Sequence, residues 1–259
     1  MHHVIMWSGG ITSWAVARQV ADLHSTESMT LLFADTLIED EDLYRWNRDA
    51  SADIGVDLTV VTDGRTPAQA NADRKWLGSA RLAHCSELLK QKPCREWLET
   101  NTDPAGTTVY VGIDWTELHR LPAIEAAYQP WTAVAPLTEP PYIDKRGWMA
   151  MARRRGLELP RMYELGYPHN NCGGACVKAG QAQWLRTLKV FPDRFAAAEK
   201  EEQAFRAEHG KDVAYLTEVV KGEKKPLPLV ELRRRSEARD ESAPPLDFGD
   251  WGGCGCLPA

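Results

Sequence analysis

The chain has 259 residues, of which 43% are hydrophobic and 26% are charged, and its formal net charge at pH 7 is −6. This length suits one large α/β domain, or one domain with a smaller appendage, and the negative charge argues against a broad basic face for nucleic acid. The apolar runs are all too short to cross a membrane, and the start of the chain lacks a signal-peptide pattern, so we expect a cytoplasmic protein.

The first predicted unit is a strand, a glycine loop and a helix. Residues 3–7 form an apolar run that predicts a buried strand, and residues 14–21 carry apolar side chains at helical spacing. Between them lies the loop 8–13, in which Gly9 and Gly10 allow a tight turn. The free N–H groups and positive dipole end of such a helix predict an anion site. A plain glycine turn is the alternative interpretation.

Short strands and helices alternate along the next hundred residues. Strands are predicted at 29–34, 58–61 and 107–113, and helices at 39–52 and over most of 67–98. This alternation predicts βαβ units and an α/β fold with a doubly wound, mostly parallel sheet. Ligands collect at the carboxyl ends of such strands. We therefore expect a site where the first loop meets Asp35-Thr36, Asp63-Gly64 and Gly112-Ile113-Asp114.

The character of the chain changes near residue 130. We expect a nucleotide-binding core over 1–130 and a cysteine-rich C-terminal extension over 131–259. Helices are predicted there at 145–155, 178–189 and 196–209, and the polar, proline-rich segment 221–245 predicts an extended or partly mobile tail. Because the tail ends on a tryptophan and two cysteines, we expect it to fold back onto the body.

Four of the six cysteines form two close pairs among glycines, Cys172 with Cys176 and Cys254 with Cys256. In a cytoplasmic protein this pattern favours metal or redox chemistry over a disulfide framework. Four thiolates suit a [4Fe–4S] cluster, and they suit zinc equally, so spacing leaves both metals open. Reduced, buried cysteines are the plain alternative, which we favour for Cys94.

Several motifs together resemble a known family. The loop Ser-Gly-Gly-Ile-Thr-Ser at 8–13 resembles the pyrophosphate loop of the adenine nucleotide alpha hydrolase superfamily. Over about the first two thirds, the chain is similar to the phosphoadenosine phosphosulfate reductase family, particularly its phage- and bacteria-encoded relatives. The stretches that carry this similarity are 33–36, 85–93, 112–120 and 166–167 ahead of the first cysteine pair.

This resemblance implies an enzyme that binds ATP with Mg²⁺, or an adenylylsulfate-type nucleotide. The residues implied for the nucleotide are Ser8, Gly9, Gly10, Thr12, Ser13, Asp35, Thr36, Gly112, Asp114, Glu117 and Arg120. It also favours a [4Fe–4S] cluster, with zinc as the alternative. The ligands implied for the metal are Cys85, Cys172, Cys176 and Cys256, with Cys254 as the alternative fourth. The catalytic candidates are Cys256, Cys254 and Asp35.

Some positions depart from the family pattern. Thr12 stands where many ATP-using members carry aspartate. Three residues separate Cys172 from Cys176, whereas the family pattern has two between its cysteines. The Glu-Cys-Gly-Ile/Leu-His tail of the reductases is absent, and Cys254-Gly255-Cys256 stands near the terminus instead. The intact Gly9-Gly10 pair favours ATP use.

Three functions fit these patterns, and we favour the first. ATP would adenylate an acceptor, a small molecule or a nucleic-acid-derived group, with release of pyrophosphate, and a sulfur donor would then thiolate it. Alternatively, a C-terminal cysteine would reduce adenylylsulfate or its 3′-phosphorylated form to sulfite with a thioredoxin-like partner. The third is a non-catalytic nucleotide-binding or iron–sulfur sensor that pairs with another protein. The sequence also leaves a homodimer open.

Overall fold

The computed structural model describes residues 1–78, 83–238 and 246–251. Its centre is a five-stranded sheet in the order β3-β2-β1-β4-β5, and every neighbouring pair is parallel. The strands are β1 (His2–Trp7), β2 (Met29–Ala34), β3 (Leu58–Val61), β4 (Thr107–Tyr110) and β5 (Thr132–Val134). The predicted α/β fold with a parallel sheet is confirmed. Because the strand order reverses beside β1, a crevice is expected between the ends of β1 and β4.

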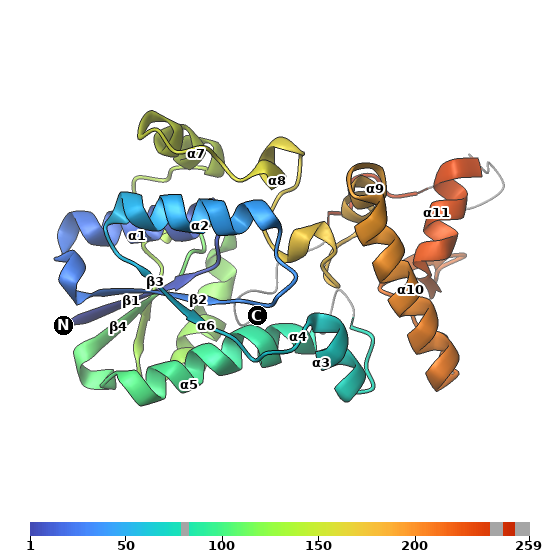
Figure 1. Ribbon diagram of the computed structural model, residues 1–259, viewed down its shortest axis with the longest axis horizontal. Coiled ribbons are helices and arrows are strands. Elements are labelled where there is room, and N and C mark those ends of the chain that lie inside the picture. The colour runs from blue at the N-terminus through green and yellow to red at the C-terminus, as the bar shows by residue number, and fades with distance from the viewer. Residues whose placement is uncertain (79–82, 239–245, 252–259) are drawn as a thin grey trace.

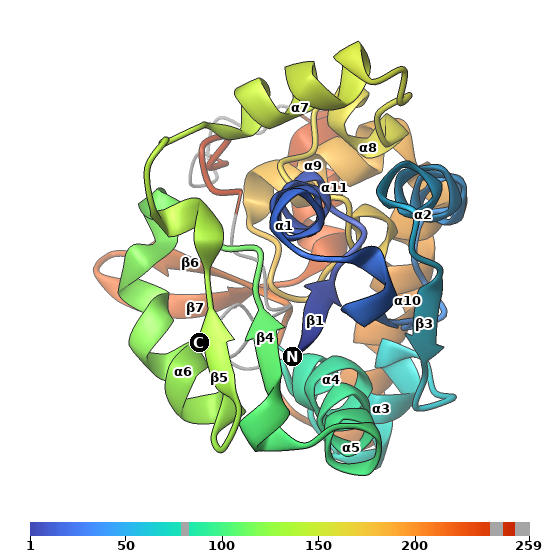
Figure 2. The same ribbon diagram turned by 90° about the vertical axis from the view of Figure 1, so that its left-hand side faces the viewer.

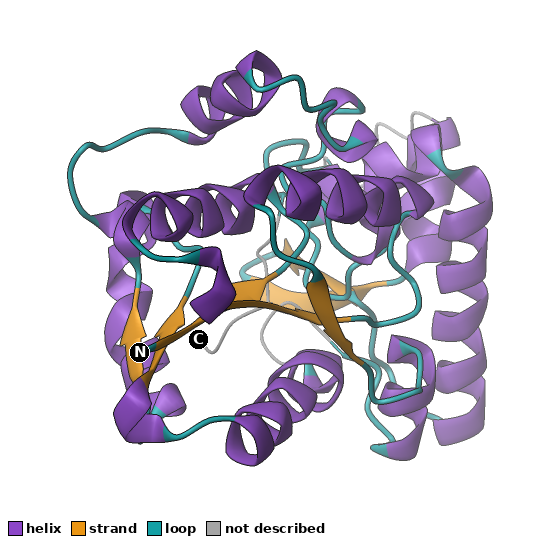
Figure 3. Cartoon of the chain, turned by 60° about the vertical axis from the view of Figure 1, so that its left-hand side comes forward, coloured by secondary structure: helices purple, strands orange, loops and turns teal. Residues whose placement is uncertain are grey.

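Helices cover both faces of the sheet (Figures 1 and 2). One face carries α1 (Ile11–Leu23) and α2 (Glu41–Ile54), with α7 (Lys145–Arg154) packed outside α1; the other carries α5 (Lys92–Asn101) and α6 (Leu121–Tyr128). Alternate residues of β1 supply the two layers: Ile5 joins the core under α1 and α2, whereas Val4 joins the core over α5 and α6. Figure 3 shows the sheet between these layers, which is the doubly wound arrangement.

The expected helix over 67–98 is divided. It comprises α3 (Pro67–Asp73), the short turn α4 (His84–Ser86) and a π-helical turn η2 (Glu87–Gln91) that continues directly into α5. π turns within helices often mark functional positions, and this one carries Lys90 to the site described below. The sheet also takes in β5, which lies within the segment that the sequence assigned to the C-terminal part.

The C-terminal part lies beyond the carboxyl ends of the strands, on the side away from the N-terminus (Figure 1). It contains α8 (Arg161–Glu164), η6 (Cys172–Gly174), α9 (Gln181–Val190), α10 (Pro192–His209), the antiparallel hairpin β6 (Leu216–Val220) and β7 (Glu223–Leu227), and α11 (Leu229–Ala238). A third hydrophobic core lies here, and its buried residues include Trp184, Phe195, Leu229 and Leu232.

The expectation of an extended tail from residue 221 is wrong as far as residue 238, because β7 and α11 occupy that segment. Leu229 and Leu232 stand one helical turn apart and are both fully buried. Two apolar residues among charged side chains predict a helix only weakly. Packing against the hydrophobic core beneath them stabilises α11. Residues 246–251 return to α9, where the backbone oxygen of Asp250 accepts a hydrogen bond from Ala182 N at 2.8 Å.

Within the described residues, no helix combines the length and apolar character that crossing a bilayer requires.

Candidate functional site

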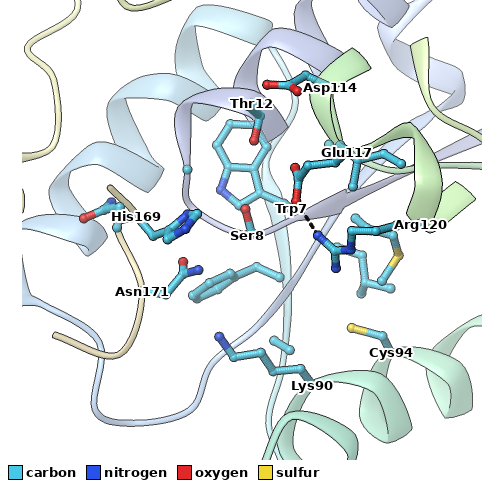
Figure 4. A pocket seen from close by; sticks show the side chains of 18 of the residues that line it. Trp7, Ser8, Thr12, Lys90, Cys94, Asp114, Glu117, Arg120, His169 and Asn171 are labelled. Carbon is cyan, nitrogen blue, oxygen red and sulfur yellow. Dashed lines mark hydrogen bonds and ion pairs between the residues drawn. The ribbon is translucent and has the colours of Figure 1, made fainter. Parts of the chain in front are cut away.

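A cavity of about 270 Å³ opens at the carboxyl ends of β1 and β4, where the strand order reverses (Figure 4). Segments distant in the sequence form its wall. The polar and glycine residues of the lining include Ser8, Gly10, Thr12, Lys90, Gly112, Asp114, Glu117, Arg120, Lys145, His169, Asn170 and Asn171. Figure 4 shows Lys90, Arg120, His169 and Asn171 arranged around one space, with Asp114 and Thr12 on its other side.

The glycine loop, residues 8–13, brings the start of α1 to this cavity. Gly9 has a φ of +72°, and a Cβ there would stand 3.0 Å from the Leu43 side chain. Gly10 lines the cavity and precedes a helix of 13 residues, and Ile11 N donates to the Tyr163 hydroxyl at 3.1 Å. The start of α1, with the positive end of its dipole, therefore lies at the cavity, as an anion site requires, while the Ile11 N–H is bound to Tyr163.

Gly112 holds the end of β4 against this loop. A Cβ at Gly112 would stand 3.1 Å from Ser13 N and 3.2 Å from the carbonyl carbon of Thr12. The chain then turns into η4 (Trp115–Arg120), whose first N–H groups are capped because Asp114 accepts from Thr116 N at 2.8 Å. Only glycine allows this approach without moving the helix start.

Three cations line the cavity, and each is held by another group. Lys90 Nζ lies 3.4 Å from Glu39 Oε1, and Arg120 Nη1 donates to Glu117 Oε1 at 2.6 Å. Lys145 donates to the backbone oxygen of Pro168 and lies 5.2 Å from the ring centre of Tyr163. Positive groups held in this way offset phosphate charge without having to be ordered when a ligand binds.

Glu39 is a site residue that the sequence analysis missed. Its side chain is 1% exposed, and it accepts hydrogen bonds from Cys172 N at 2.5 Å and from Thr36 Oγ1 at 2.9 Å, besides pairing with Lys90. One buried carboxylate thus joins the end of β2, the π turn and the cysteine loop. The sequence shows only that an acidic residue follows a strand end. Such a residue indicates the start of a helix equally well.

Two predicted nucleotide residues lie apart from the cavity. Asp35 accepts from Leu37 N at 2.8 Å and from the Tyr44 hydroxyl at 2.9 Å, and Thr36 is buried against Glu39. Gly9 and Ser13 shape the glycine loop without lining the cavity. The predicted residues that the structure brings together in its lining are Ser8, Gly10, Thr12, Gly112, Asp114, Glu117 and Arg120.

The cysteine loop, residues 166–176, contains three successive left-handed residues. Cys172, Gly173 and Gly174 have φ values of +53°, +54° and +88°. A left-handed conformation at a residue other than glycine costs about 1–3 kcal/mol and clusters at functional sites. Asn170 joins this loop to the glycine loop, because its Nδ2 donates to the Gly9 oxygen at 2.9 Å, whereas its buried Oδ1 has no partner among the described residues.

The predicted metal-binding thiols are partly assembled. A hydrogen bond to Cys176, together with burial, raises the pKa of Cys172 well above its usual value, and burial, with the nearby Cys172, raises the pKa of Cys85 to about 11. Within the part of the chain that the structure describes, no group of three or more His, Cys, Asp or Glu is placed to hold a metal ion. Cys254 and Cys256 lie outside the described residues.

Two further side chains lie near the cavity-lining residues. Cys94 is buried as expected, at 4% exposure, and burial raises its pKa to about 12, but it also lines the cavity. Trp115, directly after Asp114, is 42% exposed, and its ring centre lies 6.0 Å from that of Tyr142.

No family model matches the chain, and no curated protein matches it. Among solved structures, the chain is similar to the phosphoadenylyl-sulfate (PAPS) reductase from Candida auris, determined as a phosphate complex. The TM-score is 0.45 and the identity 20%, over 63% of this chain and 78% of that chain. The function of this chain is therefore inferred from its own site.

Proposed function

We propose that this protein is an enzyme that binds ATP in the β1–β4 cavity and transfers adenylate to an acceptor, with release of pyrophosphate. The observation that carries the proposal is the meeting of an anion-binding helix start with Lys90, Arg120 and Lys145 in one cavity. Asp114 and Glu117 line the same cavity and offer the oxygen ligands that Mg²⁺ prefers.

In the proposed reaction an acceptor oxygen attacks the α-phosphorus and the bond to the β-phosphate oxygen breaks. The N–H groups at the start of α1 would bind the departing pyrophosphate as its charge develops, and Lys90 and Arg120 would offset that charge. The glycines matter here because they let the backbone itself approach the phosphates.

The second half of the proposal is sulfur chemistry beside the nucleotide. Asn170 and Asn171 line the cavity, and Cys172 and Cys176 follow them on the same loop. Cys85, Cys172 and Cys176, with Cys256 or Cys254 as the fourth, would hold a [4Fe–4S] cluster, since soft thiolates suit that group; zinc is the alternative. If only Cys85, Cys172 and Cys176 held the cluster, one iron would lack a protein ligand and would supply a place for the sulfur that displaces the adenylate.

Pyrophosphate release and ATP affinity test the nucleotide half. We expect Lys90→Met to weaken ATP binding by about tenfold or more, because it removes a charge-assisted hydrogen bond, and Lys90→Arg to keep most of the affinity. The control is Lys92→Met, on the same helical stretch, because the Lys92 side chain is 60% exposed and its ion pair with Glu96 is long, at 3.8 Å. Failure of the unaltered protein to bind ATP would overturn the proposal.

Anaerobic purification with iron, sulfide and zinc analysis tests the metal half. About four irons per chain would support the cluster. One zinc would support the alternative metal, and a metal-free protein with full activity would remove the metal from the proposal.

A second function, reduction of a sulfonucleotide to sulfite, is favoured by one observation. Residues 246–251 lie at the start of α9, shortly after Cys176, and Cys254 and Cys256 follow them within five positions in the sequence. If Cys256 is the nucleophile, Cys256→Ser abolishes sulfite release from adenylylsulfate and leaves the metal content unchanged. If Cys256 is a ligand, the same change lowers the metal content.

A further inference from the structure

The two carboxylate oxygens of Glu39 bind groups that belong to different sites. Oε1 lies 3.4 Å from Lys90 Nζ and accepts from Thr36 Oγ1 at 2.9 Å, whereas Oε2 accepts from Cys172 N at 2.5 Å. Lys90 lines the nucleotide cavity, and Cys172 belongs to the cysteine loop. A single buried carboxylate therefore connects a cation of the nucleotide cavity to the backbone of the cysteine loop.

The contact with Lys90 is the weaker of these two connections. At 3.4 Å it is longer than the roughly 2.7–2.9 Å of a strong charge-assisted hydrogen bond, whereas the bond from Cys172 N is short. Figure 4 shows the Lys90 nitrogen directed toward the space in front of Asn171. A phosphate oxygen bound in the cavity therefore competes with Glu39 for the ammonium group of Lys90, and Glu39 keeps its bond to the cysteine loop.

The segment that carries Glu39 also holds the cysteine loop through both of its neighbours. A Cβ at Gly173 would stand 3.1 Å from the Ile38 oxygen, so the two backbones are in close contact. Asp40 pairs with Arg194 at 2.7 Å, and Arg194 donates to the Gly173 oxygen at 2.9 Å. Because three consecutive residues contact the loop, a change in the charge of the middle one acts directly on the loop backbone.

We infer that Glu39 is a positioning residue that couples occupancy of the nucleotide cavity to the cysteine loop. When a phosphate group binds Lys90, the carboxylate charge is no longer shared with an ammonium group, and the hydrogen bond from Cys172 N strengthens. The cysteine loop is thereby held more firmly while nucleotide is bound. The inference rests on the proposed nucleotide binding and adds a physical link between its two halves.

Hydrogen exchange at the backbone amide of Cys172 measures this link in the full-length protein, purified anaerobically. Mass spectrometry with electron-transfer fragmentation resolves this amide from its neighbours. We expect saturating ATP to slow its exchange by about threefold or more, because a stronger hydrogen bond lowers the population of the open form. Calorimetry on the same preparation records whether ATP is bound.

Two substitutions should move this exchange rate in opposite directions before ATP is added. Lys90→Met leaves the carboxylate charge unshared, so the Cys172 amide should exchange more slowly than in the unaltered protein. Glu39→Gln removes the charge and one acceptor oxygen, so the same amide should exchange faster. Saturating ATP should then change neither rate. If Lys90 and Glu39 merely stabilised the fold, both variants would exchange faster.

Glu41→Gln is the control, because Glu41 is exposed and stands two positions after Glu39. It should keep both the exchange rate at Cys172 and its response to ATP. Bound ATP without slower exchange at Cys172, or faster exchange in Lys90→Met, would overturn the inference and leave the proposed function intact. Absence of ATP binding would overturn the proposed function and the inference with it. Should Glu39→Gln fail to fold, the exchange rate of Lys90→Met still decides.

Discussion

The glycine loop and the cysteine loop lie next to each other, but different kinds of contact fix their conformations: local ones in the first and long-range ones in the second. In the glycine loop the left-handed residue is Gly9, and the flanking β1 and α1 belong to the same short stretch of sequence. In the cysteine loop a left-handed residue is Cys172, held by Glu39 from 133 positions earlier in the chain. One loop is encoded locally, whereas the other depends on distant side chains. Substitutions far from the cysteine loop should therefore disturb it, whereas the glycine loop should be sensitive mainly at its own contacts.

The largest expected loss of stability comes from substituting Asp40, the N-cap of α2. Its carboxylate is fully buried between Arg161 and Arg194, each at 2.7 Å, and Arg194 in turn binds the Gly173 oxygen. Asp40→Asn keeps a good cap but removes the charge, so we expect a loss of about 2–3 kcal/mol in the free energy of unfolding, allowing for the partly exposed arginines. Urea denaturation measures this loss.

The matched control for Asp40 is Asp22→Asn. Asp22 also pairs with an arginine, Arg18, at 2.8 Å, but its side chain is 65% exposed, so we expect a change below about 0.5 kcal/mol. Equal effects of the two substitutions would contradict the dependence of the cysteine loop on distant side chains.

Gly112→Ala tests the glycine loop at its closest contact. The new Cβ would stand 3.1 Å from Ser13 N, so α1 must shift, and we expect a cost of about 1–3 kcal/mol in stability and weaker ATP binding. Gly106→Ala, where the nearest atom would be 3.7 Å away, should change the stability by less than about 0.5 kcal/mol. ATP titrations and thermal unfolding of both variants decide whether the close approach matters.

The smallest expected effect is a pH dependence centred on Asp40. Burial raises the pKa of this carboxyl, but the hydrogen bonds from Arg161 and Arg194 outweigh burial and bring the pKa below its usual value. The ionised form therefore stabilises the fold above the unfolded-state pKa of about 4, and that contribution is lost as the pH falls through the lower folded-state value. Acid titration of stability should be flatter in Asp40→Asn; identical profiles would contradict this assignment.

Much of the sheet was predictable because each strand is a compact apolar run, and the glycine loop because its chemistry lies in adjacent residues. Glu39 was not, because an acidic residue after a strand gives no sign that it binds Cys172 and Lys90. The helix α11 was missed because its burial depends on Trp184 and Phe195, which are distant in sequence. Asp35 stands at a family-like strand end, and its carboxylate accepts a hydrogen bond from the Tyr44 hydroxyl, so its role in the site stays a prediction.

The contact between Asp250 and the start of α9 has a consequence for how the molecule is built. The backbone oxygen of Asp250 accepts from Ala182 N, and its side chain accepts from Gln181 N at 3.3 Å, although 69 positions separate Gln181 from Asp250. The segment from Gln181 to Asp250 thus begins and ends at one place, as inserted domains do. We expect it to open as a single cooperative unit in hydrogen exchange, separately from the sheet. Gly180 lies at the boundary where such a unit would separate from the rest of the fold. A Cβ at Gly180 would stand 2.2 Å from Asp250 Oδ1, too close for any other residue.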